Sequence, residues 1–402
     1  MPRKPVRDKY DAVLDFAPSR AVPSVAYVLV KQTYRIGERG CVLDAAQPLV
    51  HDLRDDTLQP RLPPGSDFWI QKQATDVVVQ GSAFAPNGRP IRSMTASVTV
   101  GKAAKRINVF GNRRLEWRSD GTPVIPYPET FIDMPLTYEN AYGGIDVRMD
   151  MAPPQSPEEL VKFDLLDYPG IYPRNLHGKG YLVRPEPIPG ALMPNLENPR
   201  DLLTADRLFV RDPRLWYRQP FPWCFDWTNA VMFPRMAYLG LSPCFPPPSD
   251  VSLPEVAQGI LPANFKQAYS PSLDAADSWP AIFYQEASLG MSFTALSAGI
   301  PMAVEGMHPE RARIAWQLPS PPSIQVLFEG KRVPATIRLT NCVITPADLR
   351  MCLVYAAVIA EMPRVFIPGV HKEIPFLAVI DGDRPLAYAP PVPILEQLEG
   401  KG

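Results

Sequence analysis

The sequence has few of the residues that hold metals or build disulfide frameworks. It contains 5 cysteines among 402 residues, with no Cys-x-x-Cys pair, and its 4 histidines form neither a His-Glu-x-x-His nor a His-x-His arrangement. Zinc sites and disulfide scaffolds need such spacings, so we expect neither, and we predict no metal and no cofactor. Free, buried thiols of this kind are typical of a cytoplasmic protein.

Long apolar runs and a surplus of charge are missing too. The longest apolar stretch, residues 351–360, falls well short of the roughly 20 residues that span a bilayer, and no apolar run of signal-peptide length follows the basic N-terminus. With 41 basic and 42 acidic residues, the net charge of -1 creates no overall field toward nucleic acid or an anionic membrane. We therefore expect no membrane insertion, no signal-dependent export and no nucleic-acid partner.

Motifs for nucleotide binding and for serine hydrolysis are absent. Gly178-Lys179-Gly180 begins a glycine fingerprint, but Val183 stands at the third glycine position, and no phosphate-binding loop follows a strand. No Gly-x-Ser-x-Gly elbow supplies a nucleophile. Two short basic clusters remain, which we interpret as solvated strand edges that resist edge-to-edge pairing: Lys102, Lys105 and Arg106, and Arg113, Arg114 and Arg118.

What the sequence does have is proline and strand patterning. Its 50 prolines are spread along the chain and make long helices unfavourable. Residues 25–36 and 75–84 are rich in β-branched and aromatic side chains, and residues 93–100 alternate strictly between apolar and hydroxyl side chains. Residues 104–110 can then return as an antiparallel partner.

A second antiparallel set is predicted toward the C-terminus. It consists of residues 323–328, 335–343 and 349–358, with a turn at 345–348 between the last two. A short helix is expected at 156–163.

We therefore predict a mainly β fold of antiparallel, meander-like or sandwich-like sheets with long ordered Pro/Gly-rich loops and few short helices. Because single cores stop growing at roughly 250 to 300 residues, we expect two closely packed domains, residues 1–200 and 201–402.

Three polar, glycine-rich patches interrupt the apolar sequence, at residues 135–144, 175–181 and 193–199. Carboxylates, amides and a histidine beside glycine and proline are typical of shaped surface loops. We predict that Gly143 and Gly144 adopt a backbone conformation closed to other residues, and that His177 is a hydrogen-bonded loop histidine. Two interpretations remain open. In the first, the acidic residues and the histidine converge as acid, base and orienter of a glycosidase-like site. In the second, which we favour, Glu139 and Glu197 accept N–H bonds and pin the loops. The residues concerned are Glu139, Asp146, His177 and Glu197.

Aromatic residues are densest between residues 215 and 238, a composition more typical of core or inter-domain packing than of a ligand platform. Interface energy concentrates in Trp, Tyr and similar anchors, so this region and one methionine supply candidate partner contacts. They are Met134, Trp216, Tyr217 and Trp223.

The order and spacing of the motifs resemble the family catalogued as domain of unknown function 2169, which is associated with bacterial type VI secretion. The similarity reaches from about residue 20 to residue 358. It is strongest in VKQTY (30–34), TDVVVQGSAFAPNGRP (75–90), VTVGKAAKRINVFGNR (98–113), MPLTYENAYGG (134–144), NLHGKGY (175–181) and MPNLEN (193–198).

This resemblance implies a cytoplasmic adaptor or chaperone without enzymatic activity. Such a protein binds the N-terminal or PAAR-linked region of a toxic effector and helps load the effector onto the VgrG spike. Besides the loop histidine His177, the resemblance assigns loop-scaffold and partner-contact roles together to Glu139, Tyr142, Gly143, Gly144, Gly178, Lys179, Gly180, Asn195 and Glu197.

The sequence also departs from the family pattern. Tyr142 replaces a phenylalanine, Leu176 replaces a proline, and Tyr355-Ala356 replaces a Trp-Arg pair. Two further hypotheses stay open beside the adaptor. One is a β-sandwich enzyme that acts on carbohydrate through Glu139 and Glu197, and the other is a structural component of the secreted machine.

Overall fold

The computed structural model describes most of the chain, and strands dominate it, with no helix of seven residues or more in the described part. None of its helical turns has the length and hydropathy of a bilayer-spanning segment. The mainly β, antiparallel architecture predicted above is confirmed. The described residues are 9–16, 26–50, 65–146, 148, 170–188, 190–228, 284–294, 296–359, 376–383 and 385–387.

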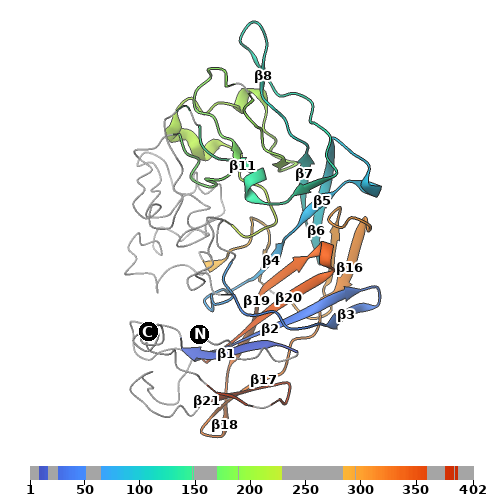
Figure 1. The fold of residues 1–402 in the computed structure, drawn as a ribbon. Coiled ribbons are helices and arrows are strands. Elements are labelled where there is room, and N and C mark those ends of the chain that lie inside the picture. Colours follow the sequence, from blue (N-terminus) through green and yellow to red (C-terminus); the bar gives the residue numbers. More distant parts are fainter. Residues whose placement is uncertain are drawn as a thin grey trace, which may run out of the picture.

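The largest sheet has seven strands in the order β1-β2-β20-β19-β4-β14, with β3 paired to the other end of β2 (Figure 1). Its neighbours are antiparallel except for β4 and β19, which run parallel. Strand β2, between β1 and β20, is buried at almost every position, which indicates that both faces of the sheet are covered there. The strands are β1 (Asp11–Phe16), β2 (Ala26–Gly37), β3 (Gly40–Leu43), β4 (Thr75–Val79), β14 (Ser292–Phe293), β19 (Thr336–Thr345) and β20 (Arg350–Ile359).

A five-stranded antiparallel sheet packs beside it in the order β13-β7-β6-β15-β16. The predicted alternation of β6 positions its apolar side chains in the core, but Ser97 is buried as well, because its hydroxyl bonds to Glu305 at 3.0 Å. The tight β6–β7 hairpin turns at Gly101, whose φ of 59° favours glycine. The strands are β6 (Ser93–Val100), β7 (Ala103–Phe110), β13 (Leu196–Glu197), β15 (Pro301–Glu305) and β16 (Arg313–Gln317).

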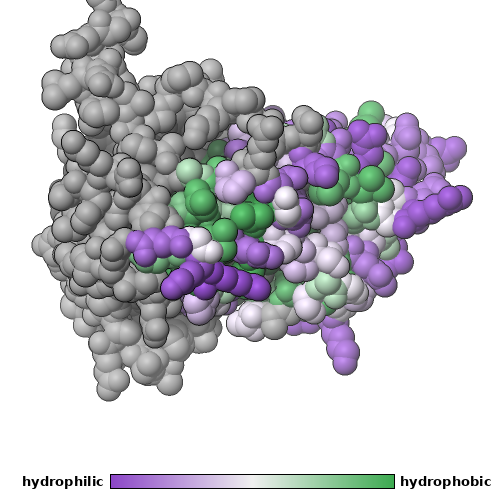
Figure 2. Space-filling model, turned by 90° about the horizontal axis from the view of Figure 1, so that it is seen from below, coloured by the Kyte–Doolittle hydropathy of each residue, from purple (hydrophilic) through white to green (hydrophobic). Residues whose placement is uncertain are grey.

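A four-stranded sheet, β18-β17-β21-β22, lies at the end of the molecule opposite the loops around β11 and β8 (Figure 1). Figure 2 views this end, where hydrophobic residues gather in the middle of the face and hydrophilic residues border them. Three two-stranded pairs complete the described strands. The remaining strands are β5 (Ser82–Phe84), β8 (Glu116–Trp117), β9 (Pro123–Val124), β10 (Asp133–Pro135), β11 (Tyr142–Gly143), β12 (Lys179–Gly180), β17 (Ile324–Phe328), β18 (Lys331–Val333), β21 (Phe376–Ile380) and β22 (Leu386–Ala387).

Several predicted strands differ in detail from the observed ones. The strand expected at 75–84 is divided into β4 and β5, because Gly81 adopts a φ of 148° between them. The β19–β20 hairpin and its turn are confirmed, but β17 joins the four-stranded sheet instead of pairing with β19. The helix expected at 156–163 lies outside the described residues.

The basic clusters are only partly solvated, which corrects their interpretation as strand edges. Lys105 is buried, and its ammonium donates to Ser288 Oγ and lies 4.1 Å from the centre of the Trp223 ring. Arg113 is buried against Glu197. In each cluster one cation therefore belongs to the interior, where it is held by an acceptor or an aromatic face.

Both large sheets combine strands from before and after residue 200, the predicted boundary between two domains. In the seven-stranded sheet, β19 and β20 stand between β2 and β4. In the five-stranded sheet, β15 pairs with β6 over four residues. Neither sheet is complete within residues 1–200.

This topology predicts that residues 1–200 and residues 201–402 do not fold when expressed separately. Without β19 and β20, the buried faces and hydrogen-bonding edges of β2 and β4 are left open. Amide proton dispersion in NMR spectra of each fragment should be that of an unfolded chain. Dispersed spectra from either fragment alone would contradict the prediction, and co-expression of the two fragments is the positive control.

Candidate functional site

The three polar patches meet in space around one lysine. The first two are joined by the parallel pair β11 and β12, and the third reaches the first through a bridge between Ala141 and Leu196. The ammonium of Lys179 donates to Asn140 Oδ1 at 2.6 Å and to Asn195 Oδ1 at 2.9 Å. One side chain of the middle patch therefore ties the other two patches together.

Two asparagines extend this connection to the backbone. Asn175 Nδ2 donates to the carbonyl oxygens of Tyr138 at 2.8 Å and Tyr142 at 3.0 Å. Asn195 Nδ2 donates to the carbonyl oxygen of Phe110, at the end of β7, at 3.0 Å. The amides thus satisfy buried carbonyl groups where the chain has no regular partner strand.

The motif glycines are needed for close approach. Gly143 and Gly144 have φ values of 149° and 90°, as expected from the sequence, and Gly180 has 92°. Gly178 is required for space, since a Cβ there would lie 2.4 Å from the Asn175 amide and 2.7 Å from the Ala141 carbonyl oxygen.

The two motif carboxylates predicted to pin the loops differ in their surroundings. Glu197 is buried, pairs with Arg113 and accepts the Leu203 N–H at 2.8 Å, so it does pin the loop. Glu139 is exposed on a short 3₁₀ turn and accepts no hydrogen bond from any residue that the structure describes.

A third carboxylate of the candidate set, Asp146, is also a structural acceptor. It accepts the Val183 N–H at 2.8 Å and forms a salt bridge with Arg148. Burial alone would raise the pKa of Asp146, but the hydrogen bonds from Arg148 and Val183 outweigh it and lower the pKa.

His177 is half-buried and has no side-chain hydrogen bond within the described residues, in contrast to the hydrogen-bonded loop histidine that we expected. Burial lowers its pKa, opposed by the negative charge of Glu139 nearby. Burial also lowers the pKa of Lys179, two residues away, and the charge of Glu139 again opposes this effect.

The proposed interface anchors lie in the interior. Met134, Trp216 and Tyr217 are all buried, and Trp216 and Tyr217 pack edge to face at 6.1 Å. Trp223 is partly buried and donates its indole N–H to the Arg106 carbonyl oxygen at 2.7 Å. Met134, Trp216 and Tyr217 therefore belong to the core in this conformation, and Trp223 is the one of the four that keeps part of its surface exposed.

The packing at Gly178 leads to a direct test of the scaffold role. Replacing Gly178 by Ala should lower the free energy of unfolding by about 2 to 3 kcal/mol, since the new methyl group overlaps backbone and amide atoms. The matched control is Gly88→Ala, because Gly88 has a φ of 65° and open space around its Cβ position. This substitution should lower the free energy of unfolding by about 1 kcal/mol. Equal losses in urea unfolding of the two alanine variants would contradict the prediction.

A buried charge cluster that was not predicted from the sequence involves residues of the seven-stranded sheet. Lys72 is fully buried, and its ammonium contacts Glu286 Oε2 at 2.7 Å, Asp76 Oδ2 at 2.9 Å and Asn341 Oδ1 at 2.7 Å. Burial opposes the charge on Lys72, but the two carboxylates outweigh it and raise its pKa. Burial, with Asp76 beside it, raises the pKa of Glu286 to about 7.

The cluster continues through Asn341 to a second ion pair. Asn341 Nδ2 donates to Asp67 Oδ1 at 3.1 Å, and Asp67 Oδ2 accepts from Lys31 Nζ at 2.8 Å. A signal was present in the sequence. Lys31, Asp76 and Asn341 each stand directly beside an apolar strand run, a position where a polar side chain is retained only with a partner.

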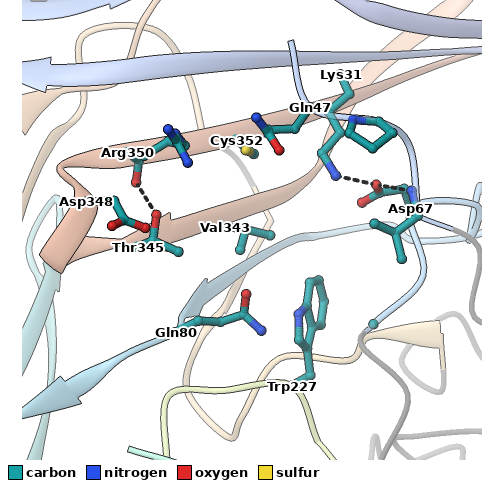
Figure 3. Close-up of a pocket in the computed structure, with 13 residues that line it drawn as sticks. Lys31, Gln47, Asp67, Gln80, Trp227, Val343, Thr345, Asp348, Arg350 and Cys352 are labelled. Carbon is teal, nitrogen blue, oxygen red and sulfur yellow. Dashed lines mark hydrogen bonds and ion pairs between the residues drawn. The ribbon is translucent and has the colours of Figure 1, made fainter. Parts of the chain in front are cut away.

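A pocket of about 250 Å³ opens beside this cluster (Figure 3). Figure 3 shows Trp227 on one side and Val343 and Cys352 on the other, with the carboxamides of Gln47 and Gln80 nearby. The loop that carries Asp67 supplies one end and the β19–β20 turn the other.

The pocket has an acidic group next to it. Gln80 Nε2 donates to Asp226 Oδ1 at 3.1 Å, and the same oxygen accepts the Trp227 backbone N–H at 2.8 Å. Burial raises the pKa of Asp226 to about 6 in spite of these bonds, and the negative charge of Glu139 adds to the effect.

This shift predicts a pH dependence of stability. The folded state keeps a proton on Asp226 up to about pH 6, whereas the unfolded state releases it near pH 4, so the free energy of unfolding should fall as pH rises between these values. In Asp226→Asn this contribution should vanish, and the stability difference between wild type and variant should change across that window. The free energies are measured by urea unfolding at each pH, and a difference between wild type and variant that stays constant across the window would contradict the assignment.

Comparison with known proteins places the patches and the pocket in one family. The family model described as "Uncharacterized protein conserved in bacteria (DUF2169)" matches residues 22–356, which include all three patches and every residue that lines the pocket. No match was found among the curated proteins or among the solved structures. In the described part of the chain, no group of three or more His, Cys, Asp or Glu side chains is arranged to hold a metal ion.

Proposed function

This chain belongs to the family described as uncharacterized protein conserved in bacteria (DUF2169), and on that premise we propose that it is an adaptor of bacterial type VI secretion. It binds a toxic effector in the cytoplasm, through the effector's N-terminal or PAAR-linked region, and helps load it onto the VgrG spike. It acts by holding and releasing a partner and not by turning over a substrate.

The observation that carries this proposal is the use of the motif side chains. Lys179, Asn195 and Glu197 bond to one another's loops or to neighbouring backbone, so the sequence motifs maintain a shape. A cross-linked loop scaffold on a β framework supports a protein that must present a fixed surface to a partner.

The carbohydrate-enzyme hypothesis draws no support from the two carboxylates it requires. Glu197 binds Arg113 through one oxygen and the Leu203 N–H through the other. Glu139 is exposed, without a described hydrogen-bond partner to orient it. A glycosidase needs both groups placed across one bond of the substrate.

The adaptor role predicts that deleting this gene abolishes secretion of the effector encoded beside it. Because the spike itself does not depend on the adaptor, secretion of VgrG and of unrelated effectors should continue. The two secreted fractions are measured by immunoblotting of culture supernatants, with the adaptor itself expected in the cell pellet. Normal effector secretion, or adaptor in the supernatant, would contradict the role.

Direct binding is the second part of this test. The purified chain should form a stable complex with the effector, and removal of the effector's N-terminal region should abolish the complex. Glu139→Gln should leave the complex intact, because Glu139 has no structural bond to lose. A loss of binding in this variant would instead place Glu139 in the contact surface.

A further inference from the structure

The pocket beside Trp227 has the size of a site for one side chain. Its volume of about 250 Å³ is below the roughly 300 to 1,000 Å³ of cavities that enclose drug-sized ligands. It is not an enclosed cavity, as expected where a chain lies across an opening and inserts a single group.

The walls of the pocket are apolar and fixed. The Trp227 ring packs directly on Gly65, where a Cβ would lie 2.2 Å from the indole carbons, so the ring is held in place. Opposite the ring are Val343 and Cys352, from neighbouring positions on β19 and β20. An aromatic face opposite aliphatic and thiol groups suits a bulky apolar side chain.

The polar groups of the pocket suit a peptide main chain. The Gln47 carboxamide has no hydrogen bond to any residue that the structure describes, and Gln80 uses only its Nε2, on Asp226. Each carboxamide can donate and accept, which is what a peptide group requires of its partner. A Gln47 carboxamide and a Gln80 carbonyl oxygen that have no hydrogen-bond partner among the described residues, beside an apolar slot, match an extended segment that inserts one side chain.

The charges of the pocket balance. Lys31 is neutralised by Asp67 at 2.8 Å, and Arg350 and Asp348 add one charge of each sign at the other end. A lining with two positive and two negative residues has no net preference for an anion or a cation, so it favours an uncharged group.

We propose that this pocket is the anchor site of the adaptor for its effector. An extended effector segment inserts one bulky apolar side chain between Trp227 and Val343, and its main chain hydrogen-bonds to Gln47 and Gln80. This inference rests on the proposed function, since the occupant is taken to be the effector.

The test compares two variants of the full-length chain. Val343→Trp fills the pocket and should weaken effector binding at least tenfold in calorimetry. Ile337→Trp is the matched control, because Ile337 lies on the same strand, is exposed and does not line the pocket, and it should change binding less than twofold. Gln47→Ala should weaken binding by about 2- to 12-fold, as for the loss of one hydrogen bond.

A second measurement uses the unaltered chain, in case Val343→Trp fails to fold. Cys352 lines the pocket, so alkylation by iodoacetamide, located by mass spectrometry, reports its occupancy. Overlapping 15-residue peptides from the effector are added, and one of them should slow the labelling of Cys352 at least fivefold but not that of Cys41. Alanine in place of the apolar anchor of that peptide should restore the rate.

The outcomes separate this inference from the proposed function. If the wild-type chain binds the effector, but Val343→Trp binds equally well and Cys352 stays unprotected, the anchor site is wrong and the adaptor role stands. If the wild-type chain does not bind the effector at all, the proposed function fails. Burial raises the pKa of Cys352 and slows its labelling in the free protein, so the change on adding peptide is what counts. A labelling rate that no peptide changes would also overturn the inference.

Discussion

The buried ammonium of Lys72 is the contact on which the arrangement of the seven-stranded sheet depends. Lys72 lies in the segment before β4. Its ammonium contacts Asp76 on β4, Glu286 in the segment before β14 and Asn341 in the middle of β19. Removing one partner from such a group leaves an uncompensated charge in the interior, which is far more costly than the net gain of the intact group. The cluster therefore specifies which segments meet more than it adds stability, and Trp227 and the pocket lie directly beside it.

The local parts of the fold could be predicted because they follow from short-range patterns. Strand β6 and its hairpin with β7 come from strict alternation and a glycine turn, and the β19–β20 hairpin from a four-residue turn. The pairing of β2 with β20 and of β4 with β19 could not be predicted, because no local pattern selects a partner that is hundreds of residues away. For the same reason the sequence suggested a boundary at residue 200, which the two sheets cross.

The sequence was sufficient to predict which loops form the candidate site, but not the role of each residue in them. Glycines beside amides indicated shaped loops, and Gly143 and Gly144 have the expected positive φ values. Whether a given carboxylate is a buried acceptor or an exposed side chain depends on packing from distant segments, which explains why Glu197 and Glu139 differ. The pocket was missed because Gln47 and Gln80 are ordinary residues until Trp227 is brought against Gly65.

The pairing of β2 with β20 also affects how the protein forms in the cell. Strand β2 ends at Gly37 and its partner β20 at Ile359, so at roughly 5 to 20 residues per second the ribosome completes β20 about 16 to 64 s after β2. During that interval the 12-residue, largely apolar β2 has β1 and β3 available on one edge and lacks β20 on the other. Such non-local pairing slows folding and leaves the edge of β2 that receives β20 open to wrong pairing until β20 is made.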